Sequence, residues 1–217
     1  MTTYRILTVC TGNVCRSPMA EAMLRHRLAG LSDVTVESAG TGALVGAPMP
    51  PEARAVLEGL GLKDDGHVAR QLTHQLVSQA DLILGLTRQH RRKVVQLDPT
   101  ATRRAFTLRE YGFVSGHVGP DDLAGAAEQV AWRQQIDGLE PDLHPLRVAT
   151  AAIFTVNGVF PIPDPGELDV LDPFGQPLEA YAAAAVRMLP AIEAIGDFFD
   201  DVTSRPIPVP GLAYAAA

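Results

Sequence analysis

The sequence predicts an α/β fold: a small sheet of four strands flanked by helices, in one domain. Two observations support this prediction. Short apolar runs alternate along the first half of the chain with segments of helical periodicity, which is typical of α/β proteins. The length of 217 residues and the hydrophobic content of 47% suit a single domain with a core large enough to fold alone.

Each expected element follows from its local pattern. We expect strands where the chain is short, apolar and bounded by turn residues, at 6–9, 34–38, 81–85 and 105–108. The second of these strands is expected to end in a turn at 39–42. Apolar residues at helical spacing predict helices over 18–30, 73–79, 87–96 and, near the end of the chain, 177–199.

The segment at about 112–163 is expected to be an insertion that carries one or two extra helices. Asp121 and Asp122 favour a helix start, and a second helical segment is expected near 146–155. The proline-rich stretch that follows should form a rigid loop rather than regular structure. We therefore expect one domain over residues 1–200 and a flexible tail over 201–217, which is rich in Pro and Ala near its end.

The loop between the first strand and the first helix has the composition of a phosphate-binding site. Its sequence is Cys10-Thr11-Gly12-Asn13-Val14-Cys15-Arg16-Ser17. Backbone N–H groups in such a loop can converge on one point, and the following helix directs its positive end to the same point. Gly12 lets the backbone turn inward, and Asn13 tolerates a left-handed φ. We expect the residues from Thr11 to Ser17 to bind a phosphoryl group.

Cys10 is the candidate nucleophile of this loop. A helix N-terminus and a guanidinium both favour the thiolate form of a nearby cysteine. Arg16 offers a planar fork that matches two phosphoryl oxygens. Ser17 can direct its hydroxyl at the sulfur and stabilise it as a leaving group. The nucleotide P-loop is excluded, because no Gly-Lys-Ser/Thr follows.

The run from Val9 to Glu21 resembles the phosphate loop of the low-molecular-weight protein tyrosine phosphatases. The resemblance implies a doubly wound, Rossmann-type fold (phosphotyrosine phosphatase I-like) with a central parallel sheet. It also implies a cysteinyl-phosphate intermediate, no metal or other cofactor, and a general acid on a late Asp-Pro loop. Ser38 and His67 resemble residues that brace the loop from behind, although each could equally be an incidental polar residue.

Two Asp-Pro pairs are candidates for the general acid. Asp172 precedes an aromatic residue, Phe174, and then the long final helix, which is the pattern that the resemblance implies. Asp164 is the alternative. Asp172 would protonate the leaving oxygen in the first step and take a proton from the attacking water in the second. Phe174 would form an apolar wall against the ring of the substrate.

These residues predict a phosphatase that acts on phosphorylated protein or a small aryl phosphate. Val14 favours phosphotyrosine, since a hydroxyl would better suit the guanidinium of phosphoarginine. A protein-arginine phosphatase, a thiol-dependent arsenate reductase and a non-catalytic phosphate-binding module are the alternatives. No cysteine follows Cys15, which weighs against reductases that relay electrons through downstream cysteines. Cys15 itself either closes a disulfide with oxidised Cys10 or simply packs.

Charge and targeting limit the remaining function classes. Residues 1–110 carry a net charge of +4 and residues 111–217 one of −11, which gives −7 for the chain. The basic run at 88–93 is expected to be a solvated helix face, so nucleic acid is not an expected partner. We find no signal segment and no apolar run of membrane-spanning length, and expect a cytoplasmic protein without a membrane partner. The sequence gives no prediction of oligomeric state.

Overall fold

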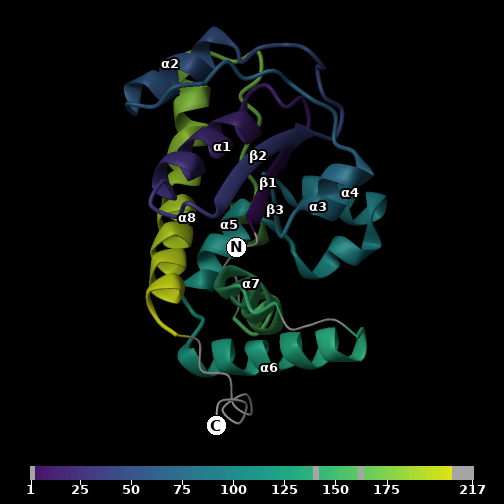
Figure 1. The fold of residues 1–217 in the computed structure, drawn as a ribbon. Coiled ribbons are helices and arrows are strands. Elements are labelled where there is room, and N and C mark those ends of the chain that lie inside the picture. Colours follow the sequence, from purple (N-terminus) through teal and green to yellow (C-terminus); the bar gives the residue numbers. More distant parts are fainter. Residues whose placement is uncertain (1–2, 139–141, 161–163, 207–217) are drawn as a thin grey trace.

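The computed structural model describes residues 3–138, 142–160 and 164–206, and its centre is a four-stranded parallel sheet (Figure 1). The strands lie in the order β2-β1-β3-β4. Their bounds are β1 (Tyr4–Cys10), β2 (Val34–Gly40), β3 (Leu82–Gly85) and β4 (Ala105–Thr107). All three neighbouring pairs are parallel, which confirms the predicted fold class.

Helices and two short 3-10 helices (η1 and η2) connect and cover these strands. In chain order they are α1 (Arg16–Arg27), α2 (Pro51–Gly59), α3 (His74–Gln79), α4 (Arg88–Leu97), η1 (Pro99–Arg103), α5 (Leu108–Ser115), α6 (Pro120–Ile136), α7 (Pro145–Val156), η2 (Pro165–Leu168) and α8 (Leu178–Ser204). Thr73, Thr87 and Thr107 accept a backbone hydrogen bond at the starts of α3, α4 and α5. Among the helices that the structure describes, none combines the length and the hydropathy that a membrane span requires.

The sheet separates two apolar cores, because successive side chains of a strand point to opposite faces. Tyr4 and Ile6 of β1 belong to the larger core, which includes buried residues of α1, α5 and α8. Leu7 and Val9 belong to the smaller core, which includes residues of α3 and α4. Both faces of the sheet are therefore covered, as in doubly wound folds.

Some boundaries differ from the sequence predictions. Strand β2 continues to Gly40 through the expected turn, because Gly40 pairs with Cys10 and also forms a bridge with Gln71. Helices α2 and α5 were not predicted, and α5 begins directly where β4 ends. Helix α8 continues to Ser204, so the predicted tail boundary at 201 is wrong. The part of the predicted tail at 207–217 lies outside the described residues.

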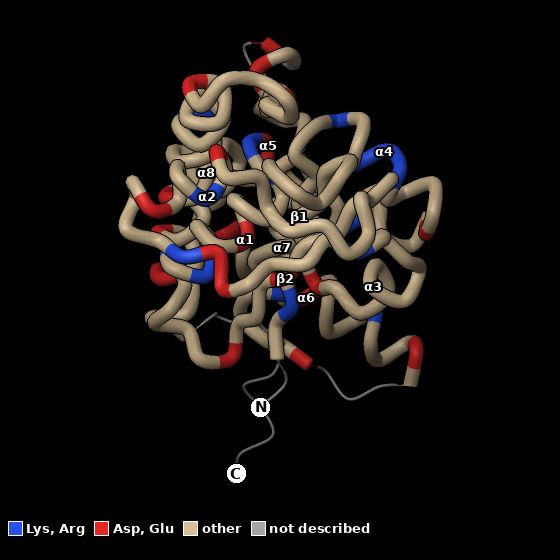
Figure 2. The backbone as a smooth tube through the Cα atoms, turned by 90° about the horizontal axis from the view of Figure 1, so that it is seen from above, with Lys and Arg blue, Asp and Glu red and all other residues tan. Residues whose placement is uncertain are grey.

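The long helix α8 carries acidic residues that hold α1 in place. Arg27 of α1 forms ion pairs with Glu193, Asp197 and Asp200 of α8. Gly196 leaves the space that the Arg27 side chain crosses, since a Cβ at this position would collide with it. Acidic and basic residues elsewhere are distributed over many elements, with several basic positions on α4 (Figure 2). Three of the acidic residues in 111–217 thus hold α8 against α1 through ion pairs.

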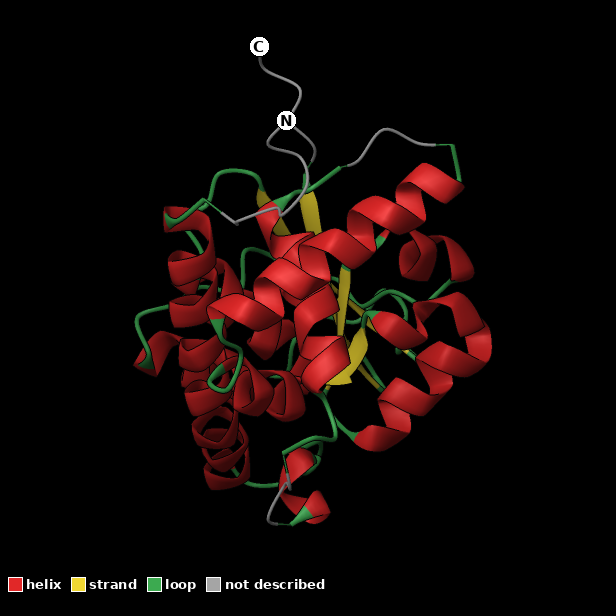
Figure 3. Cartoon of the chain, turned by 90° about the horizontal axis from the view of Figure 1, so that it is seen from below, coloured by secondary structure: helices red, strands yellow, loops and turns green. Residues whose placement is uncertain are grey.

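The insertion forms α6 and α7, as predicted, and both helices lie at the N-terminal end of the strands (Figures 1 and 3). Tyr4 Oη, at the start of β1, lies 2.5 Å from Thr150 Oγ1 of α7. Arg147 Nε donates to Asp81, just before β3, at 2.8 Å. Cys10 is at the opposite end of β1. Helices α6 and α7 therefore close the far end of the sheet, and neither of these two helices covers the Cys10 loop.

Candidate active site

The loop after β1 is fixed by backbone hydrogen bonds to the segment that follows β2. Thr11 and Gly12 accept backbone hydrogen bonds from Gly42 and Leu44, both at 3.0 Å. A Cβ at Gly40 would lie 2.5 Å from the carbonyl oxygen of Thr11, so this position requires glycine for the close approach. Asn13 has a φ of 55°, the left-handed conformation predicted for it. The loop is at the carboxyl ends of the strands, where doubly wound folds bind ligands.

Hydrogen-bond donors of the loop converge on the sulfur of Cys10. Ser17 Oγ lies 3.0 Å from Cys10 Sγ, and the backbone N–H of Asn13 donates to the same sulfur at 3.3 Å. The side chain is 2% exposed. Hydrogen-bond donors at this distance can stabilise a thiolate.

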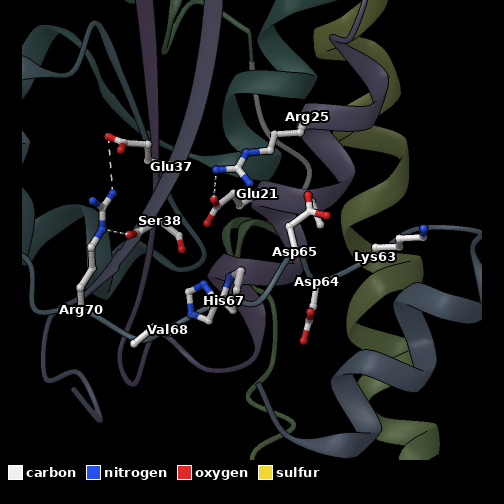
Figure 4. A pocket seen from close by; sticks show the side chains of 12 residues that line it. Glu21, Arg25, Glu37, Ser38, Lys63, Asp64, Asp65, His67, Val68 and Arg70 are labelled. Carbon is white, nitrogen blue, oxygen red and sulfur yellow. Dashed lines mark hydrogen bonds and ion pairs between the residues drawn. The ribbon is translucent and has the colours of Figure 1, made fainter. Parts of the chain in front are cut away.

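Asn13 connects the loop to the residues behind it. Its amide group donates to Ser17 Oγ at 3.0 Å and to Ser38 Oγ at 2.8 Å, and its side-chain oxygen accepts from the backbone N–H of Arg70. His67 Nε2 donates to the carbonyl oxygen of Asn13 at 2.7 Å. Figure 4 shows Ser38 and His67 among the residues that line a pocket next to the loop. The structure thus brings both predicted supporting residues onto Asn13.

Arg16 and Asp172 meet across the mouth of the site. Arg16 Nη2 lies 2.5 Å from Asp172 Oδ2, and Arg16 Nη1 donates to the carbonyl oxygen of Val170 at 3.0 Å. The Arg16 Nε–H group is buried and has no acceptor among the described residues. The Asp172 side chain is 52% exposed. A phosphoryl group that bound the guanidinium would therefore compete with the Asp172 carboxylate.

The second Asp-Pro candidate lies elsewhere. Asp164 accepts the backbone N–H of Gly166 at 2.8 Å, at the start of η2. Its position fits a helix cap, and it does not line the cavity of Cys10.

A cavity of about 200 Å³ lies above the sulfur. Its walls are Cys10, Thr11, Gly12, Val14, Cys15, Arg16, Gly42, Leu44, Asp172 and Phe174. Phe174 is 54% exposed and stands at the rim, where an apolar wall was predicted. Other cavities of the surface are larger, and the importance of this one rests on the thiol and the guanidinium that line it.

His90 is a site residue that sequence reasoning missed. It belongs to the basic run at 88–93, for which a solvated face was predicted, yet its side chain is buried. His90 Nε2 lies 3.0 Å from Thr11 Oγ1, and Nδ1 lies 2.9 Å from Thr87 Oγ1. Burial, together with the nearby charge of Arg16, lowers the pKa of His90 from 6.5 to about 4. A neutral imidazole therefore links the phosphate loop to the start of α4. The one weak signal for His90 in the sequence is Thr87, three residues earlier, which caps α4.

Cys15 has a different environment from Cys10. Its side chain is buried, and burial raises the pKa of its thiol from 9.0 to about 12. Cys15 is therefore protonated at neutral pH and is a poor nucleophile.

Within the described ranges, no group of three or more His, Cys, Asp and Glu side chains is arranged to hold a metal ion.

Comparison with known proteins identifies related chains. The family model described as "Low molecular weight phosphotyrosine protein phosphatase" matches residues 5–147. The chain is 47% identical over 105 residues to the probable low molecular weight protein-tyrosine-phosphatase EpsP of Ralstonia solanacearum, which covers 48% of this chain and 70% of that protein. It is 39% identical over 139 residues to a protein-arginine-phosphatase of Geobacillus stearothermophilus, over 63% of this chain and 89% of that one.

Solved structures give the same relationship. The low molecular weight protein tyrosine phosphatase from T. tengcongensis has a TM-score of 0.60 at 28% identity, over 90% of this chain and 99% of that chain. The YwlE arginine phosphatase from Geobacillus stearothermophilus also has a TM-score of 0.60 at 28% identity, over 91% and 94%. Both similarities extend beyond the residues that the family model covers.

Proposed function

This chain belongs to the low molecular weight phosphotyrosine protein phosphatase family, and we propose that it hydrolyses protein phosphotyrosine through a cysteinyl-phosphate on Cys10. One observation carries the proposal: Ser17 Oγ and the Asn13 N–H both point at a buried sulfur, in a cavity that Arg16 lines. Such a site can hold a dianion directly above a nucleophile. A nucleophilic thiol works only while it is reduced, which supports our expectation of a cytoplasmic enzyme.

In the first step the Cys10 thiolate attacks phosphorus, and the bond from phosphorus to the tyrosine oxygen breaks. Arg16 and the loop amides hold the phosphoryl oxygens, because this charge must be stabilised throughout the transfer. Asp172, which exchanges its ion pair with Arg16 for a proton from solvent when the phosphoryl group binds, gives that proton to the departing oxygen. The ion pair between Arg16 and Asp172 in the free protein supports this role, since it keeps the carboxyl group at the mouth of the site.

In the second step water attacks the phosphocysteine, and the bond from sulfur to phosphorus breaks. The ionised Asp172 takes a proton from the water, so one residue serves as acid and then as base. The Ser17 hydroxyl, 3.0 Å from the sulfur, stabilises the thiolate as it leaves. Inorganic phosphate and the free thiolate are the products.

Phosphoarginine is the second candidate substrate, because a protein-arginine-phosphatase is 39% identical to this chain over 139 residues. The observation that weighs against it is Val14, which lines the cavity with an apolar side chain. An apolar residue offers no hydrogen bond to a guanidinium leaving group, whereas it can pack against an aromatic ring. We therefore place phosphotyrosine first.

The test compares the wild type with Cys10→Ser and, as a matched control, Cys15→Ser. We expect the wild type to hydrolyse an aryl phosphate without added thiol, Cys10→Ser to be inactive, and Cys15→Ser to remain active. Acid-quenched wild type should carry a phosphoryl adduct on Cys10. Binding of phosphate without turnover would instead indicate a non-catalytic module, and activity in Cys10→Ser would reject the proposed nucleophile.

A further inference from the structure

A second cavity lies at the end of the sheet opposite Cys10, between η1 and the inserted helices α6 and α7. Its volume is about 360 Å³. Four arginines line it, Arg103, Arg104, Arg133 and Arg147, and Asp81 is its acidic residue. Cavities of this size suit small organic ligands rather than protein segments.

The basic lining stands out against the composition of this part of the chain. Residues 111–217 carry a net charge of −11 and contain four basic residues, all arginines. Two of these four, Arg133 of α6 and Arg147 of α7, line the same cavity. The remaining two arginines of the lining come from η1 and the residue after it. The fold thus gathers cations from three separate elements at one place.

Two of the four arginines are already used to hold the walls. Arg147 pairs with Asp81 and Asp142, which fixes α7 against the start of β3. Arg104 donates to the carbonyl oxygen of Thr100 and lies 3.6 Å from Asp98. The Arg104 Nε–H group is nevertheless buried without an acceptor among the described residues. A buried donor without an acceptor is unfavourable, so an acceptor that reached it would be stabilised.

The guanidinium groups of the other two arginines can bind an anion. The guanidinium of Arg103 lies 4.8 Å from the centre of the Phe154 ring, so an aromatic face and not a carboxylate positions it. Among the residues that the structure describes, no carboxylate lies within ion-pair distance of Arg103 or Arg133. Phe154, Val130 and Ala151 provide an apolar wall beside these two guanidinium groups.

We propose that this cavity binds a small organic phosphate, with the phosphoryl oxygens on Arg103 and Arg133 and the carbon part against Phe154. Guanidinium forks match phosphate geometry, and two of them balance a dianion. A simple carboxylate carries one negative charge, so it would balance only one of the two guanidinium groups. The site is independent of the Cys10 loop, because the two lie at opposite ends of the strands.

Binding can be tested with ADP as the probe, by calorimetry and by amide chemical shifts of 15N-labelled protein. We expect ADP to shift amides of α7 around Thr150 and Ala151, and not those of Gly12 and Asn13. ADP should bind at least about tenfold more tightly than inorganic pyrophosphate, which lacks the carbon part, and adenosine should not bind measurably. Equal binding of pyrophosphate and ADP, or of adenosine and ADP, would overturn the proposal.

Substitutions locate the ligand. Arg103→Ala and Arg133→Ala should each weaken ADP binding at least about tenfold and leave aryl phosphate hydrolysis unchanged. Arg92→Ala, which removes the same charge from the exposed face of α4, is the matched control and should bind as the wild type does. Arg133→Gln is a second, milder surface variant with the same expected loss. Unaltered ADP binding in Arg103→Ala and Arg133→Gln, or shifts confined to the Cys10 loop, would reject the site.

Discussion

The guanidinium of Arg16 and the carboxylate of Asp172 lie 2.5 Å apart, although 156 positions separate them in the sequence. Arg16 also donates to the carbonyl oxygen of Val170, and Val170 donates to the carbonyl oxygen of Leu86. The acid-bearing segment is therefore tied both to the phosphate loop and to the end of β3 before any substrate arrives. A phosphoryl group that bound the Arg16 guanidinium would compete with the Asp172 carboxylate for it.

Asp172→Asn tests the assignment of the general acid. We expect kcat to fall about 10²–10⁴-fold on a phosphate ester with a basic leaving group, because its oxygen then departs without a proton. The loss should be much smaller for an activated ester whose leaving group needs no proton. Steady-state rates on the two esters measure this difference. Asp164→Asn is the matched control and should lower neither rate; a selective loss in that variant instead would move the acid to Asp164.

His90 should make the stability of the protein depend on pH. Its pKa is about 4 in the folded protein and 6.5 ordinarily, so between these values the unfolded chain binds a proton that the native protein does not. The free energy of unfolding should therefore decrease as the pH falls from 6.5 to 4, by up to about 3 kcal/mol from this residue. The other charged groups that face the ring are Arg16, Lys93, Asp169 and Asp172, and all four are present in both the wild type and a variant of His90.

Urea unfolding of His90→Gln at several pH values measures this contribution. Glutamine can both donate and accept a hydrogen bond but does not titrate. In the variant, the free energy of unfolding should therefore decrease less between pH 6.5 and pH 4 than it does in the wild type. His26→Gln removes an exposed histidine of α1, and its free energy of unfolding should depend on pH as that of the wild type does. If the free energy of unfolding of His90→Gln depended on pH as that of the wild type does, His90 would not be the source of this pH dependence.

The predictable part of the site is the part that is contiguous in sequence. The loop from Cys10 to Ser17 could be interpreted from its residues, because a strand, a glycine turn and a helix start follow each other there. His90 could not, since the surrounding charged residues indicate a solvated face and only the tertiary fold brings its ring to Thr11. The position of the insertion at the far end of the sheet was equally unpredictable, because it depends on contacts such as that of Tyr4 with Thr150.

Val14→Thr tests the preference for phosphotyrosine. Val14 lines the cavity above Cys10, and threonine has nearly the same shape with one hydroxyl added. We expect the ratio of kcat/KM for phosphoarginine to that for phosphotyrosine peptides to rise, because the hydroxyl can bond the guanidinium and displaces an apolar contact with the ring. Val14→Ile keeps the apolar character and should not raise the ratio. A wild type that already prefers phosphoarginine would reverse our order of substrates.

Cys15 should close a disulfide with oxidised Cys10 slowly at neutral pH. The sulfenic acid on Cys10 and the thiol of Cys15 would give a disulfide and water, and the attack requires the Cys15 thiolate. Burial raises the pKa of Cys15 to about 12, so its thiolate fraction increases about tenfold per pH unit between pH 7 and 9. Mass spectrometry after mild peroxide should show more disulfide, relative to sulfinic acid, at the higher pH. A share of disulfide that does not change with pH would contradict this account, and Cys15→Ser should give sulfinic acid alone.

Thr150→Val tests whether the insertion stabilises the sheet. Thr150 Oγ1 lies 2.5 Å from Tyr4 Oη and 3.1 Å from Tyr111 Oη, and all three side chains are buried. Valine keeps the shape but removes the shared hydroxyl, so the free energy of unfolding should fall by about 1–3 kcal/mol. Thr155→Val changes an exposed threonine of the same helix, whose hydroxyl bonds only the backbone of Ala151, and should cost much less. Urea unfolding measures both changes. Aryl phosphate hydrolysis should be unaffected in either folded variant, because Thr150 lies at the opposite end of β1 from Cys10; a lower kcat in Thr150→Val at full folding would show that the insertion acts on the active site.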